Sequence, residues 1–131
     1  MQLYLVRHAE AVDGEPDELR PLTAAGRLAA RTLGERLAAD GVVPDAVLTS
    51  PLLRARETGA EVARPAGLEA EADERLAPGA TAEDVRAAAG GRGETVVVVG
   101  HQPDCGRIAA ALTGRDEPRF PPAGMLAIDL A

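Results

Sequence analysis

The sequence predicts a three-layer α/β/α sandwich with a mainly parallel central sheet and helices on both of its faces. Three short runs are almost wholly apolar and rich in β-branched residues, at residues 3–6, 46–49 and 95–99. A continuous apolar run is typical of a strand buried on both faces, as in a parallel sheet. Segments with helical periodicity separate these runs, and strands that alternate with helices indicate an α/β fold.

The chain has room for one domain, which we expect to span residues 1–131. Its composition, 46% apolar and 27% charged residues, is ordinary for a folded protein with one core. The net charge is -7, and the aromatic residues are one Phe and one Tyr. Because nucleic-acid binding normally needs a basic stripe or aromatic residues that stack on bases, nucleic acid is not an expected partner.

The single cysteine, Cys105, excludes an internal disulfide and a cysteine-rich zinc site. Such cysteine usage is typical of a reducing compartment. The sequence does not begin with a charged leader and a long apolar run, and no uninterrupted apolar segment approaches the ~20 residues that a membrane span needs. We therefore expect a cytoplasmic protein with no membrane partner.

The first strand, residues 3–6, leads into a charged segment, residues 10–21, that contains two prolines and shows no periodicity. We expect this segment to form a loop over the carboxyl end of the strand, where loops can contact substrates.

Thr23 is the expected N-cap of a helix over residues 24–40, and Gly41 is its expected stop. One face of this helix is apolar and is expected to pack on the core. Its members are Ala25, Leu28, Ala29, Thr32, Leu33 and Leu37.

The second strand, residues 46–49, ends at Ser50 and Pro51. Serine as N-cap and proline at the first helical position predict a helix start there. Arg54 then falls in the first helical turn, where the helix dipole disfavours a cation. A bound anion that interacts with both the arginine and the helix N-terminus would explain this placement.

The remaining elements alternate in the same way. They are a short strand over residues 69–72, a loop over 73–80, a helix over 82–89, a strand over 95–99, a helix from Pro103 to Gly114, a loop over 115–124 and a final strand over 125–130.

Polar residues of related type follow the three apolar strands. Arg7 and His8 follow the first, Arg54 lies a turn beyond the second, and Gly100 and His101 follow the third. If the strands are neighbours, these side chains converge on one small volume. Guanidinium groups suit phosphoryl oxygens, one imidazole can attack phosphorus and the other can stabilise the oxygens. The constellation predicts a phosphoryl-transfer site.

Four segments carry a resemblance to a known family, in the family's order. They are residues 5–10 (LVRHAE), 22–26 (LTAAG), 49–58 (TSPLLRARET) and 99–103 (VGHQP). The chain resembles the histidine phosphatase superfamily, whose signature is an R-H-G/A tripeptide after the first strand. The small size and the G-H-x-P form of the last motif resemble its short SixA-type phosphohistidine phosphatase branch. This resemblance implies the phosphoglycerate-mutase-like fold and a hydrolase that uses no metal or other cofactor.

Carried over by position, the resemblance also implies a role for each site residue. His8 would be the nucleophile that forms a phosphohistidine intermediate. Arg7, Arg54 and His101 would bind the phosphoryl group, and the backbone amide of Gln102 would add a further donor. Ser50 is expected to cap its helix and not to react.

The sequence departs from the family at the general acid. Many members carry a glutamate acid in a loop followed by a Y-G or W-E-G element, which is absent from residues 73–79. Glu74 is the nearest candidate, although a solvated loop glutamate is the simpler interpretation. An alkoxide leaving group needs a proton, whereas a ring-protonated phosphohistidine releases neutral imidazole unaided. Phosphohistidine-containing proteins are therefore a coherent substrate hypothesis.

Other catalytic classes are less well supported. A cysteine phosphatase would need a C-x5-R loop, but Ala111 stands six residues after Cys105. A metal hydrolase would need a ligand spacing such as H-E-x-x-H, which the sequence lacks. Two alternatives stay open: hydrolysis of a small phosphorylated metabolite, and a catalytically weak module that binds phosphate or docks a phosphoprotein.

Overall fold

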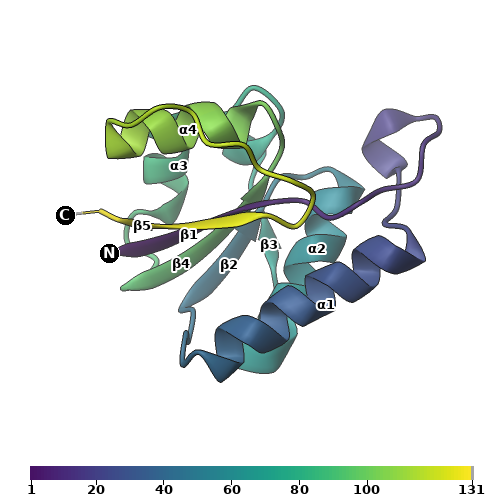
Figure 1. Ribbon diagram of the computed structural model, residues 1–131, viewed down its shortest axis with the longest axis horizontal. Helices are drawn as coiled ribbons and strands as arrows, with labels where there is room; N and C mark the ends of the chain where they lie inside the picture. Colours follow the sequence, from purple (N-terminus) through teal and green to yellow (C-terminus); the bar gives the residue numbers. More distant parts are fainter. Residues whose placement is uncertain (131) are drawn as a thin grey trace.

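The computed structural model describes residues 1–130, within which strands and helices alternate (Figure 1). The strands are β1 (Gln2–Arg7), β2 (Ala46–Thr49), β3 (Glu71–Ala72), β4 (Thr95–Gly100) and β5 (Met125–Asp129). The helices are α1 (Ala24–Ala39), α2 (Leu53–Ala63), α3 (Ala82–Ala89) and α4 (Asp104–Thr113), with short 3-10 helices η1 (Asp17–Leu19), η2 (Arg64–Ala66) and η3 (Glu74–Leu76).

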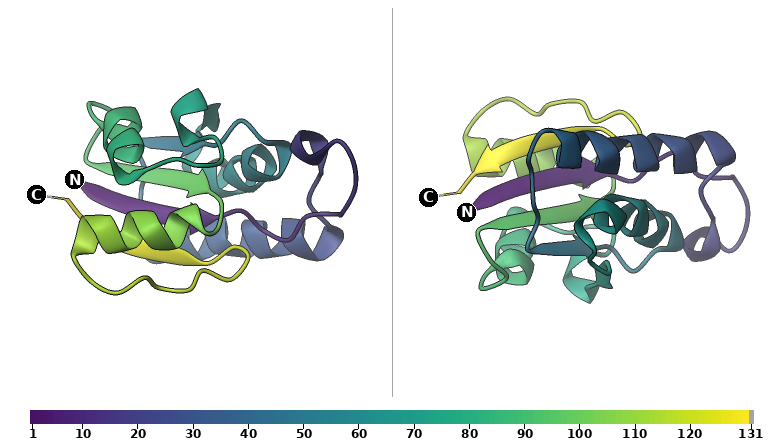
Figure 2. Two further views of the ribbon diagram at one scale, coloured as in Figure 1. Left: turned by 90° about the horizontal axis from the view of Figure 1, so that it is seen from above. Right: turned by 90° about the horizontal axis from the view of Figure 1, so that it is seen from below.

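The five strands form one sheet in the order β3-β2-β4-β1-β5. Every pairing is parallel except that of β5, which lies antiparallel to β1 at the edge. Figure 2 shows β1 between β4 and β5. The predicted α/β class with a mainly parallel sheet is confirmed.

Helices cover both faces of the sheet, with α3 and α4 on one face and α1 and α2 on the other (Figure 1). Alternate side chains of β1 enter the two cores, because successive residues of a strand point to opposite faces. Leu3 and Leu5 pack with Val85 of α3 and Ile108 of α4, whereas Val6 belongs to the core under α1 and α2. This two-sided burial is the reason for the continuous apolar runs in the sequence.

The carboxyl ends of β2, β4 and β1 lie side by side at one edge of the sheet. Arg7 pairs with Gly100, and Thr49 pairs with Val99, so the three chains leave the sheet at the same level. The residues that follow these strands are therefore brought together, as expected for neighbouring parallel strands.

The buried face of α1 agrees only in part with the predicted one, because Leu33 and Leu37 are buried as expected whereas Ala25, Leu28, Ala29 and Thr32 are exposed. Leu28 is 61% exposed, and the buried residues are Gly26, Ala30, Leu33, Gly34 and Leu37. A Cβ at Gly26 would collide with the Glu10 carbonyl oxygen, and a Cβ at Gly34 would lie 2.8 Å from the Glu61 carbonyl oxygen. The helix thus packs through Leu33 and Leu37 and also through glycines that allow close backbone contact, and a pattern of apolar residues does not identify these glycine positions.

Two helices begin later than predicted. The N-cap of α2 is Leu52, not Ser50, because the Ser50 N–H still donates to Val99 O in the sheet, at 3.0 Å. The N-cap of α4 is Pro103, whose ψ of 1° lies outside the helical region, so the helix itself begins at Asp104.

Across residues 1–130, none of the helices combines the length and the apolar character required to cross a lipid bilayer.

The corrected face of α1 can be tested with a matched pair of leucines. Leu33→Ala is expected to lower the free energy of unfolding by about 2–5 kcal/mol, because Leu33 is 6% exposed and its loss leaves a cavity. Leu28→Ala removes the same atoms from an exposed position and is expected to cost less than about 0.5 kcal/mol. Denaturant unfolding measures both, and equal losses would contradict the observed packing.

Candidate active site

The two histidines of the chain meet at the carboxyl edge of the sheet. His8 follows β1 and His101 follows β4, and the His8 N–H donates to Gly100 O at 2.9 Å, which extends the strand pairing by one residue. The ring centroids of the two histidines lie 5.3 Å apart, and their planes are tilted by 57°. Side chains 93 positions apart in the sequence are thus close enough to contact one small group.

His8 is held in one tautomer by a backbone carbonyl. Its Nδ1 lies 2.7 Å from Ala9 O, and since a carbonyl oxygen only accepts, Nδ1 carries the hydrogen. Nε2 of the neutral ring therefore has a free lone pair. Burial and the charges of Arg54 and Arg7 lower the pKa of His8, although the bond to Ala9 opposes this shift. These features keep Nε2 available as a nucleophile.

His101 is 5% exposed and more strongly perturbed. Its Nε2 lies 2.7 Å from Ser50 Oγ, whereas its Nδ1 is buried and has no hydrogen-bond partner among residues 1–130. Burial, followed by the charges of His8 and Arg54, lowers the pKa of His101 to about 4. The ring is therefore neutral near physiological pH.

Two arginines flank these rings. Arg7, the last residue of β1, donates from one terminal nitrogen to Phe120 O at 2.9 Å, and its Nε is buried without a hydrogen-bond partner in the described part of the chain. Arg54, in the first turn of α2, is 8% exposed. Its side chain is thus fixed near the helix N-terminus, where the sequence predicted an anion.

Two buried polar atoms at this edge lack a hydrogen-bond partner. Among residues 1–130, the buried side-chain polar atoms without a hydrogen-bond partner are Arg7 Nε, His101 Nδ1 and Glu61 Oε2, and the first two belong to the edge. A buried donor without an acceptor costs about 1–3 kcal/mol, so a ligand that supplies acceptors recovers this energy. A tetrahedral oxyanion supplies several acceptors in a small volume.

Asp17 is a member of the site that sequence reasoning missed. The loop before α1 is closed by a bridge between Ala11 and Leu22, and η1 within it contacts α2. Arg54 donates to Asp17 O at 2.9 Å and to Asp17 Oδ2 at 3.2 Å. Hydrogen bonds from Arg20, and then from Arg54, lower the pKa of Asp17. The loop has no periodicity, so no local signal predicts this contact.

Two other predicted residues stand apart from this cluster. Glu74 is exposed on η3, and within residues 1–130 it makes no hydrogen bond or ion pair with either histidine or with Arg7 or Arg54. Gln102 directs its side chain to α4, where Oε1 accepts from Gly106 N–H at 2.8 Å. The Gln102 backbone N–H donates to no protein atom of the described chain, so it is available to a ligand.

Cys105 is not a competing nucleophile. It is fully buried next to Gly100, and burial raises the pKa of its thiol to about 12. The reactive thiolate is therefore negligible at physiological pH.

The described residues offer no metal site. The His, Cys, Asp and Glu side chains in residues 1–130 do not form any cluster of three or more that could hold a metal ion.

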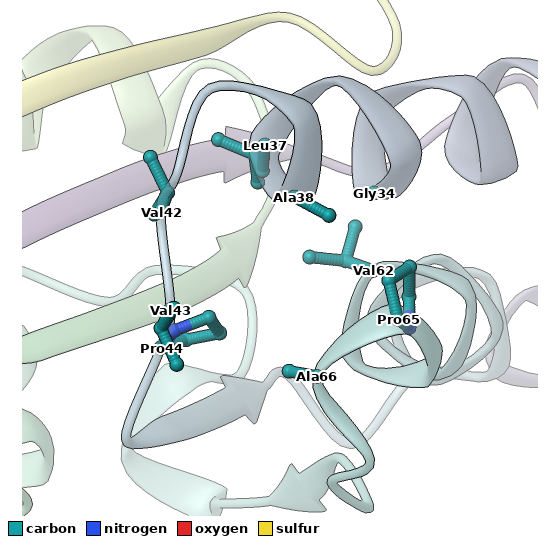
Figure 3. A pocket seen from close by; sticks show the side chains of 9 residues that line it. All are labelled: Gly34, Leu37, Ala38, Val42, Val43, Pro44, Val62, Pro65 and Ala66. Carbon is teal, nitrogen blue, oxygen red and sulfur yellow. The ribbon is translucent and has the colours of Figure 1, made fainter.

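An apolar hollow of about 320 Å³ lies between α1 and α2, next to the start of β2 and therefore away from the carboxyl edge that carries the histidines (Figure 3). It carries no titratable side chain and so offers no acid, base or nucleophile. Its lining residues are Gly34, Leu37, Ala38, Val42, Val43, Pro44, Val62, Pro65 and Ala66.

The fold is that of an α/β protein with two arginines and two histidines gathered at the carboxyl edge of its sheet. A sequence profile of the histidine phosphatase superfamily (branch 1) matches residues 3–78. Phosphohistidine phosphatase SixA of Escherichia coli (strain K12) is 30% identical over 138 residues, which cover 99% of this chain and 86% of SixA. The chain belongs to the histidine phosphatase superfamily, in its SixA-type branch, and is a phosphatase.

Solved structures agree with this assignment. The structure of the protein histidine phosphatase SixA complexed with tungstate has a TM-score of 0.89 at 30% identity, covering 99% of this chain and 88% of that one. The α-ribazole phosphatase from Shigella flexneri has a TM-score of 0.78 at 21% identity, covering 100% and 91%, and at that identity shows the fold alone. The family and the phosphoglycerate-mutase-like fold expected from the four motifs are confirmed.

The electrostatics of the edge can be tested by NMR titration of the two imidazoles. Both midpoints are expected below 6.5, since burial and nearby cations disfavour the charged rings, and that of His101 is expected at about 4. The variant His8→Asn assigns the two signals. A midpoint at or above 6.5 for either ring would contradict the described surroundings.

Proposed function

We propose that the chain removes the phosphoryl group from phosphohistidine in a phosphorylated protein, through a covalent phosphohistidine on His8. The observation that carries this proposal is the bond from His8 Nδ1 to Ala9 O, which leaves the Nε2 lone pair free beside two arginines. The SixA relative bears the name phosphohistidine phosphatase, which supports the same substrate class.

In the first step, His8 Nε2 attacks phosphorus and the P–N bond to the substrate histidine breaks. The electron pair of the broken P–N bond goes to the leaving ring. This ring is already protonated on its other nitrogen and departs as neutral imidazole. Arg7, Arg54 and His101 stabilise the three phosphoryl oxygens, and the Gln102 N–H adds a donor. The unpartnered Arg7 Nε and His101 Nδ1 support these roles.

In the second step, water attacks phosphorus and the bond between phosphorus and His8 Nε2 breaks. The electron pair returns to Nε2, so the neutral imidazole is restored. Dihydrogen phosphate forms and loses a proton to solvent. The same donors serve both steps, since the transferred group keeps its three oxygens throughout.

The carboxylates near the edge favour phosphohistidine over a phosphate ester. Asp17 is held ionised by Arg20 and Arg54, and an ionised carboxylate has no proton to give. Glu74 is exposed and does not contact the cluster. An ester substrate would thus lose its alkoxide without help from either group, whereas imidazole needs no such help.

The covalent step can be tested by rapid mixing with ³²P-labelled phosphohistidine protein. An acid-labile adduct is expected on the wild type and none on His8→Asn, whose turnover should fall by roughly 10³-fold or more. His101→Asn is the matched control, because it removes an imidazole from the same edge but leaves Nε2 of His8 in place. The adduct is therefore expected to form on this variant as well. An adduct that persists in His8→Asn would contradict the proposal, and binding without any adduct would support a docking module.

The substrate class can be tested by comparing a phosphohistidine protein, a phosphoserine peptide and a panel of sugar phosphates. The value of kcat/KM for phosphohistidine is expected to exceed that for the esters by roughly 10²-fold or more, the usual contribution of a general acid. An activated ester with a good leaving group is the control for an intact active site. Equal or faster turnover of a sugar phosphate would identify a small-metabolite phosphatase instead.

A further inference from the structure

Ser50 makes a side-chain contact that the covalent chemistry does not explain. It directly follows β2 and is fully buried. Its Oγ lies 2.7 Å from His101 Nε2 and also accepts a hydrogen bond of 3.3 Å from the Leu52 N–H. The hydroxyl is thus shared between the start of α2 and a ring at the candidate active site.

The partners of Ser50 determine the direction of the hydrogen bond to His101. A hydroxyl has one hydrogen to donate and lone pairs that accept. The Leu52 N–H is itself a donor, so it uses a lone pair of Oγ. The acceptor left among the contacts of Oγ is His101 Nε2. The hydroxyl therefore donates to Nε2, and the hydrogen of the neutral ring resides on Nδ1.

Two separate reasons disfavour the other tautomer of His101, in which Nε2 carries the hydrogen. If Nε2 carried the hydrogen, the Ser50 hydroxyl would be buried with two donors around it and no acceptor, which costs free energy. The Nδ1 lone pair would also be available only to a donor, whereas an oxyanion offers none. His101 would then repel the group that the arginines attract.

We propose that Ser50 is a positioning residue that holds His101 in the Nδ1–H tautomer and thereby makes it a neutral hydrogen-bond donor to a phosphoryl oxygen. The role toward the oxyanion rests on the proposed function, whereas the tautomer itself is a property of the free protein. The buried Nδ1 without a partner is the donor in question. The lowered pKa of His101 agrees, since tautomers matter only for a neutral ring.

The two histidines thus expose different ring nitrogens to a ligand, because one ring contacts a hydrogen-bond acceptor and the other contacts a donor. A carbonyl acceptor holds the hydrogen on Nδ1 of His8 and leaves Nε2 to attack. A hydroxyl donor occupies Nε2 of His101 and leaves Nδ1–H to donate. Ser50 therefore acts through His101 and touches no reacting atom.

The tautomer can be measured on the wild-type protein by ¹⁵N NMR of its two imidazoles, assigned with His8→Asn. Nδ1 of His101 is expected to be protonated and Nε2 unprotonated. Ser50→Ala is expected to give a mixture of both tautomers and to weaken vanadate binding about tenfold, the loss of roughly one hydrogen bond. A protonated Nε2 in the wild type would overturn the proposal, whether or not the variant folds.

Thr49→Val is the matched control. Thr49 is fully buried beside Ser50, and its hydroxyl donates to Ser50 O at 2.9 Å without touching His101. This variant should keep both the wild-type tautomer and its vanadate affinity. Tautomer populations that respond equally to both variants would assign the effect to loosened packing and reject a specific role for Ser50. The ³²P adduct on His8 is measured separately, so its absence would refute the proposed function and leave the tautomer result intact.

Discussion

The parallel register of β1, β4 and β2 is the constraint on which the site depends. Two backbone hydrogen bonds continue this register beyond the strands, from His8 N–H to Gly100 O at 2.9 Å and from Ser50 N–H to Val99 O at 3.0 Å. A slip of one residue would turn every following side chain to the other face of the sheet. The buried aliphatic side chains that fix the register therefore also fix where both histidines and Ser50 stand.

The same strand-end position gives the two imidazoles different chemistry because their immediate partners differ. His8 donates to Ala9 O, and His101 contacts the Ser50 hydroxyl. Burial lowers the pKa of both rings, and the flanking guanidinium groups act in the same direction. Because the imidazoles are neutral, the cationic charge of the edge lies on the guanidinium groups of Arg7 and Arg54. This separation of charge from the free Nε2 lone pair of His8 suits the proposed binding of an oxyanion beside a nucleophile.

Sequence reasoning succeeds where local patterns carry the information. The apolar runs predict buried strands, and the polar residues after them predict a shared edge, since parallel strands end together. It fails where a contact depends on a loop conformation or a side-chain direction that no pattern encodes, as for Asp17 with Arg54 and for Ser50 with His101. The packing face of α1 is predicted only in part, because Gly26 and Gly34 allow close backbone contact without contributing an apolar side chain to the pattern.

We propose that this edge binds a transferring phosphoryl group with His8 as the nucleophile, and a crystal structure of the protein with orthovanadate would reveal the attacking atom. A five-coordinate vanadium bonded to His8 Nε2 is expected, with equatorial oxygens that accept hydrogen bonds from Arg7 Nε, Arg54 and His101 Nδ1. Vanadate bound away from His8, or bonded to another side chain, would show that His8 is not the nucleophile.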